Sequence, residues 1–268
     1  MKRKFAVIGV GNMARSIISG ITANDIPVSE FYLYDKISAA CNGYKDNKLF
    51  YIKESIISAV ENADCVLLSV KPQNYSEVLN EIKQVSGFNK KLYISIGAGI
   101  SSQSVSDELS GAPVVRVLPN LPMTIGMGVS VICKNDNISS SDFDFIDAVF
   151  KSSGSTTLID EKDMNAIIGV TSSSPAYVFK FINAICLGAE AQGLNSKELL
   201  DTVCDMVIGS AMLLKQSSDT PSELISKVAS KGGTTEQALI KLNEGGFDET
   251  IKQAMIACTK RADELGKK

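Results

Sequence analysis

Two patterns of hydrophobic and polar positions divide the chain. Through about the first 160 residues, short apolar and largely β-branched runs alternate with amphipathic segments. The apolar runs predict strands at residues 5–9, 31–34, 65–70, 92–96 and 114–118, with further strands at 130–134 and 155–159. Helical spacing of apolar positions predicts helices near 12–23, 55–62, 75–85 and 102–109. Because the strand runs lack polar alternation and helices separate them, we expect a parallel sheet covered on both faces.

The pattern changes at about residue 161. No β-branched run of strand type follows, and helical periodicity continues to Lys268. Residues with capping chemistry mark four helix starts: Ser174 before Pro175, Asn195 with Glu198, Thr220 before Pro221 with Glu223, and Thr234 with Gln237. We therefore predict a doubly wound α/β domain at residues 1–160 and an all-helical domain at residues 161–268.

The composition excludes several kinds of chemistry. The chain of 268 residues contains no histidine, so it has no Ser-His-Asp triad and no imidazole base. It also lacks histidine metal ligands, and we expect no metal site. The net charge of −3 does not provide the basic surface that nucleic-acid binding needs.

Cysteine spacing and hydropathy bear on location. Six cysteines are scattered along the chain, and even the nearest pair, Cys186 and Cys204, is too far apart for a C-x-x-C motif. No apolar stretch reaches the roughly 18 residues of a membrane span. We expect a cytoplasmic protein with reduced thiols that neither enters a membrane nor binds nucleic acid.

A dinucleotide-binding motif follows the first predicted strand directly and opens a helix. The motif is G-x-G-x-x-A, formed by Gly9, Val10, Gly11, Asn12, Met13 and Ala14. The first glycine permits the tight turn, the second lets the backbone approach a pyrophosphate, and the alanine lets the helix pack on the sheet. The helix N-terminus then offers N–H groups to the phosphates. The alternative is a glycine-rich turn that binds nothing.

The second predicted strand ends at an acidic residue. Asp35 lies 24 residues beyond Gly11, close to the position at which an acid binds the ribose 2′-hydroxyl of NAD. Its carboxylate would repel a 2′-phosphate, whereas the neighbouring Lys36 would attract one. The alternative is a surface turn that begins with Asp. The residues leave the choice between NADPH and NADH open.

Four further segments carry a resemblance to a known family. They are VKPQ at residues 70–73, RVLPNLP at 116–122, SSPAY at 173–177 and GGTT at 232–235. With the N-terminal motif, they make the chain resemble pyrroline-5-carboxylate reductase over nearly its whole length. The resemblance implies a Rossmann domain, a helical dimerisation domain, and a homodimer or larger homo-oligomer. It also implies reduction of the C=N bond of 1-pyrroline-5-carboxylate, a small imine, to L-proline with NADPH or NADH, the last step of proline biosynthesis.

Cofactor residues follow from this resemblance. The segment Val70, Lys71 and Pro72 resembles the family's nicotinamide-side loop, at the carboxyl end of a strand where α/β sheets bind ligands. Gly97 and Ala98 end another strand with small residues that give a cofactor ring room to approach. Both segments could instead be ordinary strand-ending turns.

Substrate residues come from the helical half. Gly232 and Gly233 would expose backbone N–H groups to the substrate carboxylate. The resemblance places the Thr235 hydroxyl against the imine nitrogen and makes Thr234, Ser230 and Ser173 substrate contacts. The alternative is a capped helix start without further function. A cyclic imine arrives protonated, so the reduction does not need a histidine as a general acid.

Arg116 either forms a structural ion pair at the end of the sheet or holds a carboxylate in a bidentate contact.

Some residues depart from the family's usual pattern. Ser172 and Ser174 stand where the family usually has glycines, and Lys231 replaces a proline before the two glycines. Two other functions therefore stay open: a related imine or ketone reductase acting on another small carboxylate, and a non-catalytic dinucleotide-binding regulator. Apolar stretches at residues 178–187, 203–214 and 251–257 predict burial against a second copy of the chain.

Overall fold

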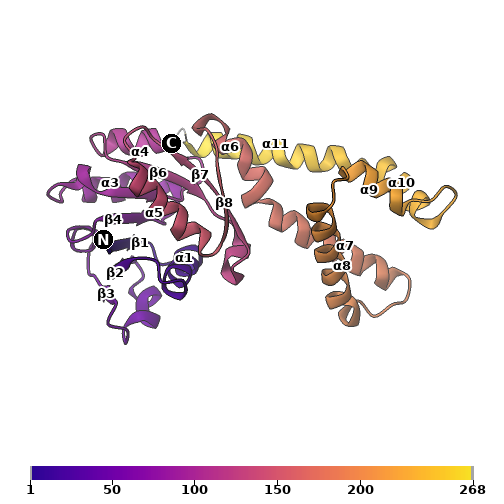
Figure 1. Ribbon diagram of the computed structural model, residues 1–268, viewed down its shortest axis with the longest axis horizontal. Coiled ribbons are helices and arrows are strands. Elements are labelled where there is room, and N and C mark those ends of the chain that lie inside the picture. The colour runs from indigo at the N-terminus through magenta and orange to yellow at the C-terminus, as the bar shows by residue number, and fades with distance from the viewer. Residues whose placement is uncertain (1, 267–268) are drawn as a thin grey trace. The chain divides into compact units, whose positions relative to one another are not determined.

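A single eight-stranded sheet forms the N-terminal part of the computed structural model, which describes residues 2–266. Met1, Lys267 and Lys268 lie outside the described residues, and so does the end of the predicted helical region. The strands are β1 (Arg3–Ile8), β2 (Val28–Tyr34), β3 (Phe50–Ile52), β4 (Cys65–Leu68), β5 (Leu92–Ser95), β6 (Val114–Leu118), β7 (Gly128–Lys134) and β8 (Gly154–Leu158). Figure 1 shows the strands side by side, and their order is β3-β2-β1-β4-β5-β6-β7-β8.

The sheet departs in one respect from the expected parallel arrangement. The strands from β3 to β6 pair in parallel, but β7 runs antiparallel to β6, and β8 is parallel to β7. The chain between β6 and β7 contains only a short 3₁₀ turn at Leu121–Ile125. A parallel strand needs a long crossover, so this short connection forces the reversal.

Helices cover both faces of the sheet, as predicted. They are α1 (Asn12–Ala23), α2 (Ile56–Val60), α3 (Tyr75–Ile82), α4 (Ser102–Glu108), α5 (Ser140–Lys151) and α6 (Met164–Ile167). One buried cluster contains Ile17 of α1 and Val149 of α5 and packs these helices on one face of the sheet. A second cluster contains Val60 of α2 and Val105 of α4 and packs helices α2, α3 and α4 on the other face. The α/β fold class is thus confirmed. The sequence pattern missed β3, a three-residue strand, and α5.

The chain divides into two compact units. Residues up to Ser173, together with those from Met255 onward, form the first unit, and Ser174–Ala254 form the second. This division differs from the boundary expected near residue 160. Met164 and Ile168 lie in a buried cluster with Leu118 of β6 and Val131 of β7, so the segment after β8 packs on the sheet.

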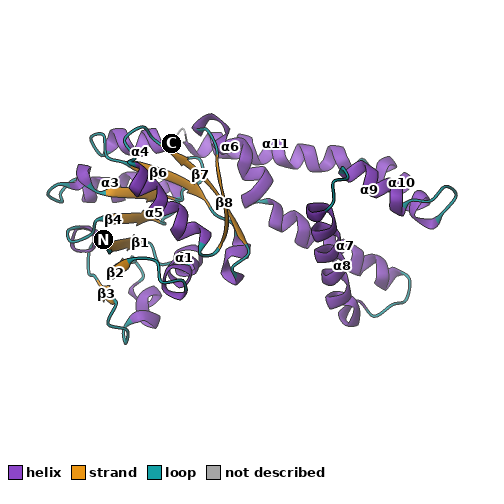
Figure 2. Ribbon diagram, in the orientation of Figure 1, coloured by secondary structure: helices purple, strands orange, loops and turns teal. Residues whose placement is uncertain are grey.

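The second unit is entirely helical in the described residues, as expected. It contains α7 (Ser174–Ala191), α8 (Ser196–Gln216), α9 (Pro221–Val228), α10 (Thr234–Glu244) and the first residues of α11 (Phe247–Gly266) (Figure 2). Many of its large apolar side chains are exposed, among them Val178, Phe179, Phe181, Leu187, Met206, Ile208, Met212 and Leu213. Within residues 2–266, no helix has the length and apolar character needed to cross a bilayer.

Two of the four predicted helix caps are confirmed. The Asn195 side chain caps α8, and Thr220 forms a capping box with Glu223 at α9. The other two predictions are wrong. Ser174 is already the first residue of α7, because the chain enters it from a π-helical turn at Ile168–Ser172. Gly233, not Thr234, is the N-cap of α10.

Candidate active site

The order of strands creates a switch point in the first unit. From β1 the chain continues to β2 and β3 on one side, whereas β4, β5 and β6 lie on the other. Open α/β sheets bind dinucleotides at the carboxyl ends of the strands beside such a point. The predicted cofactor residues follow the carboxyl ends of β1, β2, β4 and β5.

The turn after β1 has the geometry of a phosphate-binding loop. Gly9 has a φ of +93°, and a Cβ atom there would lie 2.6 Å from the carbonyl oxygen of Ser69. Only glycine fits both constraints. A Cβ on Gly11 would meet no described atom within 4 Å, so the start of α1 is open. Asn12 is exposed, Met13 half-buried and Ala14 buried against the sheet. These residues fit a dinucleotide pyrophosphate at the helix N-terminus.

Asp35 connects the end of β2 to this turn. Its Oδ2 accepts a hydrogen bond from the N–H of Val10 at 2.7 Å, and its Oδ1 accepts one from Ile37 at 2.8 Å. A carboxylate has further lone pairs, so these bonds leave room for a ribose hydroxyl. Lys36 beside it is exposed. The sequence did not predict that Asp35 also stabilises the phosphate-binding turn.

A pocket of about 280 Å³ opens beside the turn. Four predicted cofactor residues line it: Met13, Val70, Lys71 and Ala98. The remaining wall is mainly apolar and is formed by Ile96, Leu118, Pro119 and Ile168, together with Ser69 and Ser172. A mostly apolar pocket with a few polar groups suits an aromatic ring that carries a polar substituent. We call it the ring pocket. Pro72 begins the 3₁₀ turn next to it.

The structure gives a reason for glycine at position 97 that the sequence did not indicate. A Cβ on Gly97 would lie 2.7 Å from the ring of Tyr75, so the small residue makes room for tyrosine. The Gly97 N–H donates to Tyr75 Oη at 2.9 Å. The same hydroxyl lies 3.1 Å from the Leu68 carbonyl and 3.0 Å from Ser95 Oγ. Burial raises the pKa of Tyr75 to about 12. Tyr75, which the sequence analysis missed, thus joins the ends of β4 and β5.

Arg116 is a structural residue. Its side chain is 2% exposed, and Nη1 lies 2.6 Å from Glu161 Oε1. Nη2 donates to Asn165 Oδ1 at 2.6 Å. Burial by itself raises the pKa of the Glu161 carboxyl, but hydrogen bonds from Ser102 and Arg116 and the guanidinium charge hold that pKa below its ordinary value. Of the two interpretations of Arg116, the structure favours pairing at the end of the sheet.

Ser173 lies in the first unit, next to the ring pocket residue Ser172. Its N–H donates to the Ile168 carbonyl at 2.9 Å and closes the π-helical turn. Its hydroxyl lies 3.1 Å from the Cys258 thiol of α11. The sequence did not indicate this neighbour, since 85 residues separate the two.

The glycine pair lies in the second unit, and its geometry differs from the expected one. The Gly232 N–H donates to Glu236 Oε2 at 2.7 Å, and the Gly233 N–H donates to the Ser230 carbonyl at 2.9 Å. The expectation that both N–H groups are open to a ligand is therefore wrong. No side chain in the described chain caps α10, whose first residues are Thr234 and Thr235. Donors for an anion at this helix N-terminus would be the N–H groups of these threonines.

The predicted residues fall into two sets. The cofactor residues and Ser173 belong to the first unit, whereas Ser230 and residues 232–235 belong to the second. Within the first unit, the structure brings together Met13, Val70, Lys71 and Ala98. Within the second, Gly232, Gly233 and Ser230 form one turn at the start of α10.

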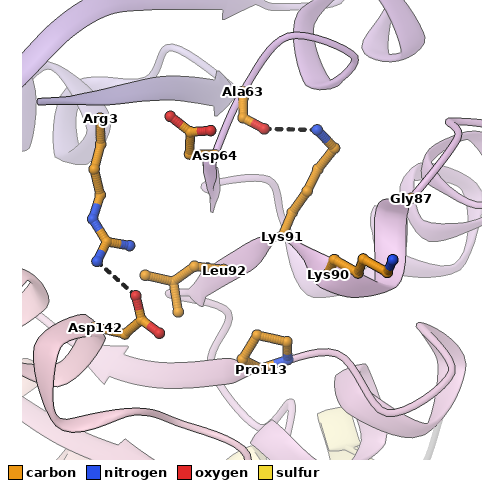
Figure 3. A pocket seen from close by; sticks show the side chains of 9 residues that line it. All are labelled: Arg3, Ala63, Asp64, Gly87, Lys90, Lys91, Leu92, Pro113 and Asp142. Atoms are coloured by element: carbon orange, nitrogen blue, oxygen red, sulfur yellow. Dashed lines mark hydrogen bonds and ion pairs between the residues drawn. The ribbon is translucent and has the colours of Figure 1, made fainter. Parts of the chain in front are cut away.

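Another pocket, of about 370 Å³, lies at the amino ends of the strands (Figure 3). Its arginine, its two aspartates and Lys91 already have partners. Arg3 pairs with Asp142 at 2.6 Å, and Lys91 Nζ donates to the Ala63 carbonyl at 2.6 Å. Burial lowers the pKa of Lys91. Because ligands of α/β sheets bind at the opposite edge, this pocket is not the candidate site.

Comparisons with known proteins agree with this geometry. Residues 161–265 match the family model for pyrroline-5-carboxylate reductase dimerisation, and residues 4–99 match that for NADP oxidoreductase, coenzyme F420-dependent. Pyrroline-5-carboxylate reductase of Vibrio alginolyticus is 33% identical over 99% of this chain and 98% of its own length. The enzyme from Streptococcus pyogenes has a similar crystal structure, with a TM-score of 0.90, 29% identity and coverage of 98% and 99%. That of Plasmodium falciparum, solved with NADP bound, gives a TM-score of 0.88 at 27% identity, and the match covers 98% of each chain.

Proposed function

The chain belongs to the pyrroline-5-carboxylate reductase family, and from this premise we propose how its own residues perform the family's reaction. It is an NAD(P)H-dependent oxidoreductase that reduces the C=N bond of 1-pyrroline-5-carboxylate to L-proline, the last step of proline biosynthesis. The observation that carries this function is the similarity to reductases at 33% identity over nearly the full length.

The first unit holds the cofactor. The start of α1 binds the pyrophosphate through Gly11, Asn12 and Met13, since the backbone there is open. Bound NAD(P)H supplies the hydride. Val70, Lys71, Pro72 and Ala98 surround the ring, and the apolar wall of the ring pocket excludes water from it.

Thr235 is the residue we assign to the imine nitrogen. The imine arrives protonated, so the protein needs only to orient it and to hydrogen-bond its nitrogen. Hydride transfer to the carbon removes the positive charge from that nitrogen. Thr235 is half-buried on the first turn of α10. Thr235→Val keeps the shape and removes the hydroxyl, so kcat should fall about 5- to 30-fold with little change in KM.

Thr234→Val is the matched control for this test. Thr234 is the exposed neighbour on the same turn, and it is not the N-cap of α10. The variant should therefore leave both kcat and helix stability nearly unchanged, and any effect should appear in KM, because Thr234 belongs to the helix start that we assign to the substrate carboxylate. Equal effects of the two substitutions on kcat would contradict the assignment of Thr235 and would favour Ser173 or Lys231.

The substrate carboxylate binds at the same helix start. Gly233 and the Ser230 carbonyl form the turn that brings the N–H groups of Thr234 and Thr235 to its surface. The Glu236 carboxylate, bonded to Gly232, lies at this turn and opposes a second anion. Glu236→Gln keeps the side-chain acceptor and removes the charge. We expect KM for the imine to fall severalfold, and a rise would refute a carboxylate subsite here.

The protein assembles as a homodimer or a larger homo-oligomer. The exposed apolar side chains of α7 and α8 support this, because such a surface favours association with a second copy. Light scattering at micromolar concentration should give at least twice the mass of one chain. A monomer would refute the proposal. The cysteines, all within the described residues, are free thiols, which is consistent with the cytoplasm.

A substrate comparison separates the reductase from its alternatives. NADH and NADPH oxidation should be measured with 1-pyrroline-5-carboxylate, piperideine-2-carboxylate and pyrroline-2-carboxylate. We expect turnover with the first. Turnover with only the other two would indicate a related imine reductase. No turnover with any of the three would indicate a non-catalytic dinucleotide-binding regulator.

A further inference from the structure

The π-helical turn Ile168–Ser172 brings a serine to the ring pocket. Hydrogen bonds hold the turn: the Asn120 side chain donates to the Thr171 carbonyl at 3.0 Å, and the Ser173 N–H donates to the Ile168 carbonyl. Asn120 is itself 6% exposed, and its Oδ1 accepts from Val129. Single π-helical turns occur often at functional sites. The backbone of Ser172 is therefore set at the wall of the pocket.

The Ser172 hydroxyl is a buried polar group without a partner. Among residues 2–266, its Oγ has no hydrogen-bond partner. Buried hydroxyls are usually hydrogen-bonded, because leaving one unsatisfied is unfavourable. Since no bond fixes the present rotamer, rotation about Cα–Cβ to another staggered position costs no hydrogen bond. Such a side chain can turn toward a ligand in the pocket that it lines.

The other residues of the pocket indicate which ligand group it would meet. Ile96, Leu118 and Ile168 provide apolar surface that suits an aromatic ring. Met13 belongs to the phosphate-binding turn, so a dinucleotide held there extends its ring into this pocket. The polar group that the nicotinamide ring carries is its carboxamide, which both donates and accepts hydrogen bonds.

We propose that the Ser172 hydroxyl hydrogen-bonds the nicotinamide carboxamide and so fixes the orientation of the cofactor ring. The proposal rests on the cofactor site assigned under the proposed function. Ser172 is then a cofactor-binding residue with a distinctive energetic signature. Its hydroxyl has no hydrogen bond in the cofactor-free protein and gains one in the complex. Removing the hydroxyl should therefore not destabilise the cofactor-free protein but should weaken cofactor binding.

Ser172→Ala tests this by equilibrium binding. Titration should follow NADH, NADPH and, as fragments without the ring, ADP-ribose and 2′-phospho-ADP-ribose. The dissociation constants of NADH and NADPH should rise about 3- to 10-fold, the effect of one neutral hydrogen bond. Those of the fragments should not change. The thermal midpoint of the cofactor-free protein should stay the same or rise.

Ser29→Ala is the control. Its hydroxyl donates to the Arg3 carbonyl at the amino end of the sheet, so binding of NADH and of ADP-ribose should both be unaffected. Equal weakening of NADH and ADP-ribose by Ser172→Ala, or a lower thermal midpoint, would show a structural role and overturn the proposal. Unchanged NADH binding with a raised KM for the imine would overturn it too, because the partner would then be substrate. Failure of the wild type to reduce the imine contradicts the proposed function alone, since the titrations need no imine.

Discussion

The Gly97→Ala variant tests how strongly the packing of Tyr75 restricts the residue at position 97, just after β5. The added Cβ would lie 2.7 Å from Cζ and Oη of Tyr75 and 2.8 Å from Cε2. Tyr75 is 4% exposed, and its hydroxyl bonds the Leu68 carbonyl and Ser95, so the ring has little freedom to move away. Overpacking of this kind costs about 1–3 kcal/mol. Any shift of the Tyr75 ring that relieves this contact breaks the bond that its hydroxyl accepts from the backbone N–H of residue 97, which adds about 1 kcal/mol.

The expected destabilisation is thus roughly 2–4 kcal/mol, which corresponds to a thermal midpoint lower by roughly 4–16 °C in a protein of this size. Urea and thermal unfolding of the cofactor-free protein, followed by circular dichroism, measure it. Tyr75→Leu supplies the decisive background, because it removes the ring atoms that the Cβ meets. In that background, Gly97→Ala should cost less than about 1 kcal/mol.

Tyr75→Phe is the matched control, since it keeps Cζ and Cε2 and so keeps most of the clash. An equal cost of Gly97→Ala in the wild-type and Tyr75→Leu backgrounds would refute the reasoning. So would weakened cofactor binding without any loss of stability, because that result would mean that Gly97 makes room for the cofactor ring.

Four further measurements test other parts of the structure. Glu161 has a lowered pKa, so its contribution to stability is present above its ordinary value of 4.5 and is lost as the pH falls through the lowered value. Glu161→Gln should therefore lower the free energy of unfolding at neutral pH, and the difference from wild type should shrink below pH 4.5. Asp35→Ser should shift preference toward NADPH, and a wild-type preference of about tenfold for NADPH would contradict the ribose assignment. Gly9→Ala should abolish dinucleotide binding because of the positive φ and the contact with Ser69, and an unchanged dissociation constant would argue against the turn. Asn195→Ala should lower stability by about 1 kcal/mol through loss of the α8 cap, whereas no shift in the urea midpoint would refute that contribution.

Local patterns in the sequence determined much of the first unit. The motif from Gly9 to Ala14 predicted both the turn and the helix, and α1 begins and ends where expected. Apolar runs located the central strands because each is buried on both faces, which leaves a continuous signal. The caps at Asn195 and Thr220 were also predictable, since their partners lie within three residues.

The tertiary structure decided what depends on distant partners. The sequence could not show that Gly97 also makes room for Tyr75, which lies 22 positions earlier in the chain and occupies the space beside it. Arg116 acquired its role from Glu161, and Ser173 its neighbour from α11. Spacing along the chain could not reveal these contacts, because packing brings together residues that no local period relates. The sequence likewise could not show that Met164 and Ile168 pack on the sheet, which is why the first compact unit extends to Ser173 although the match to the dimerisation family model begins at residue 161.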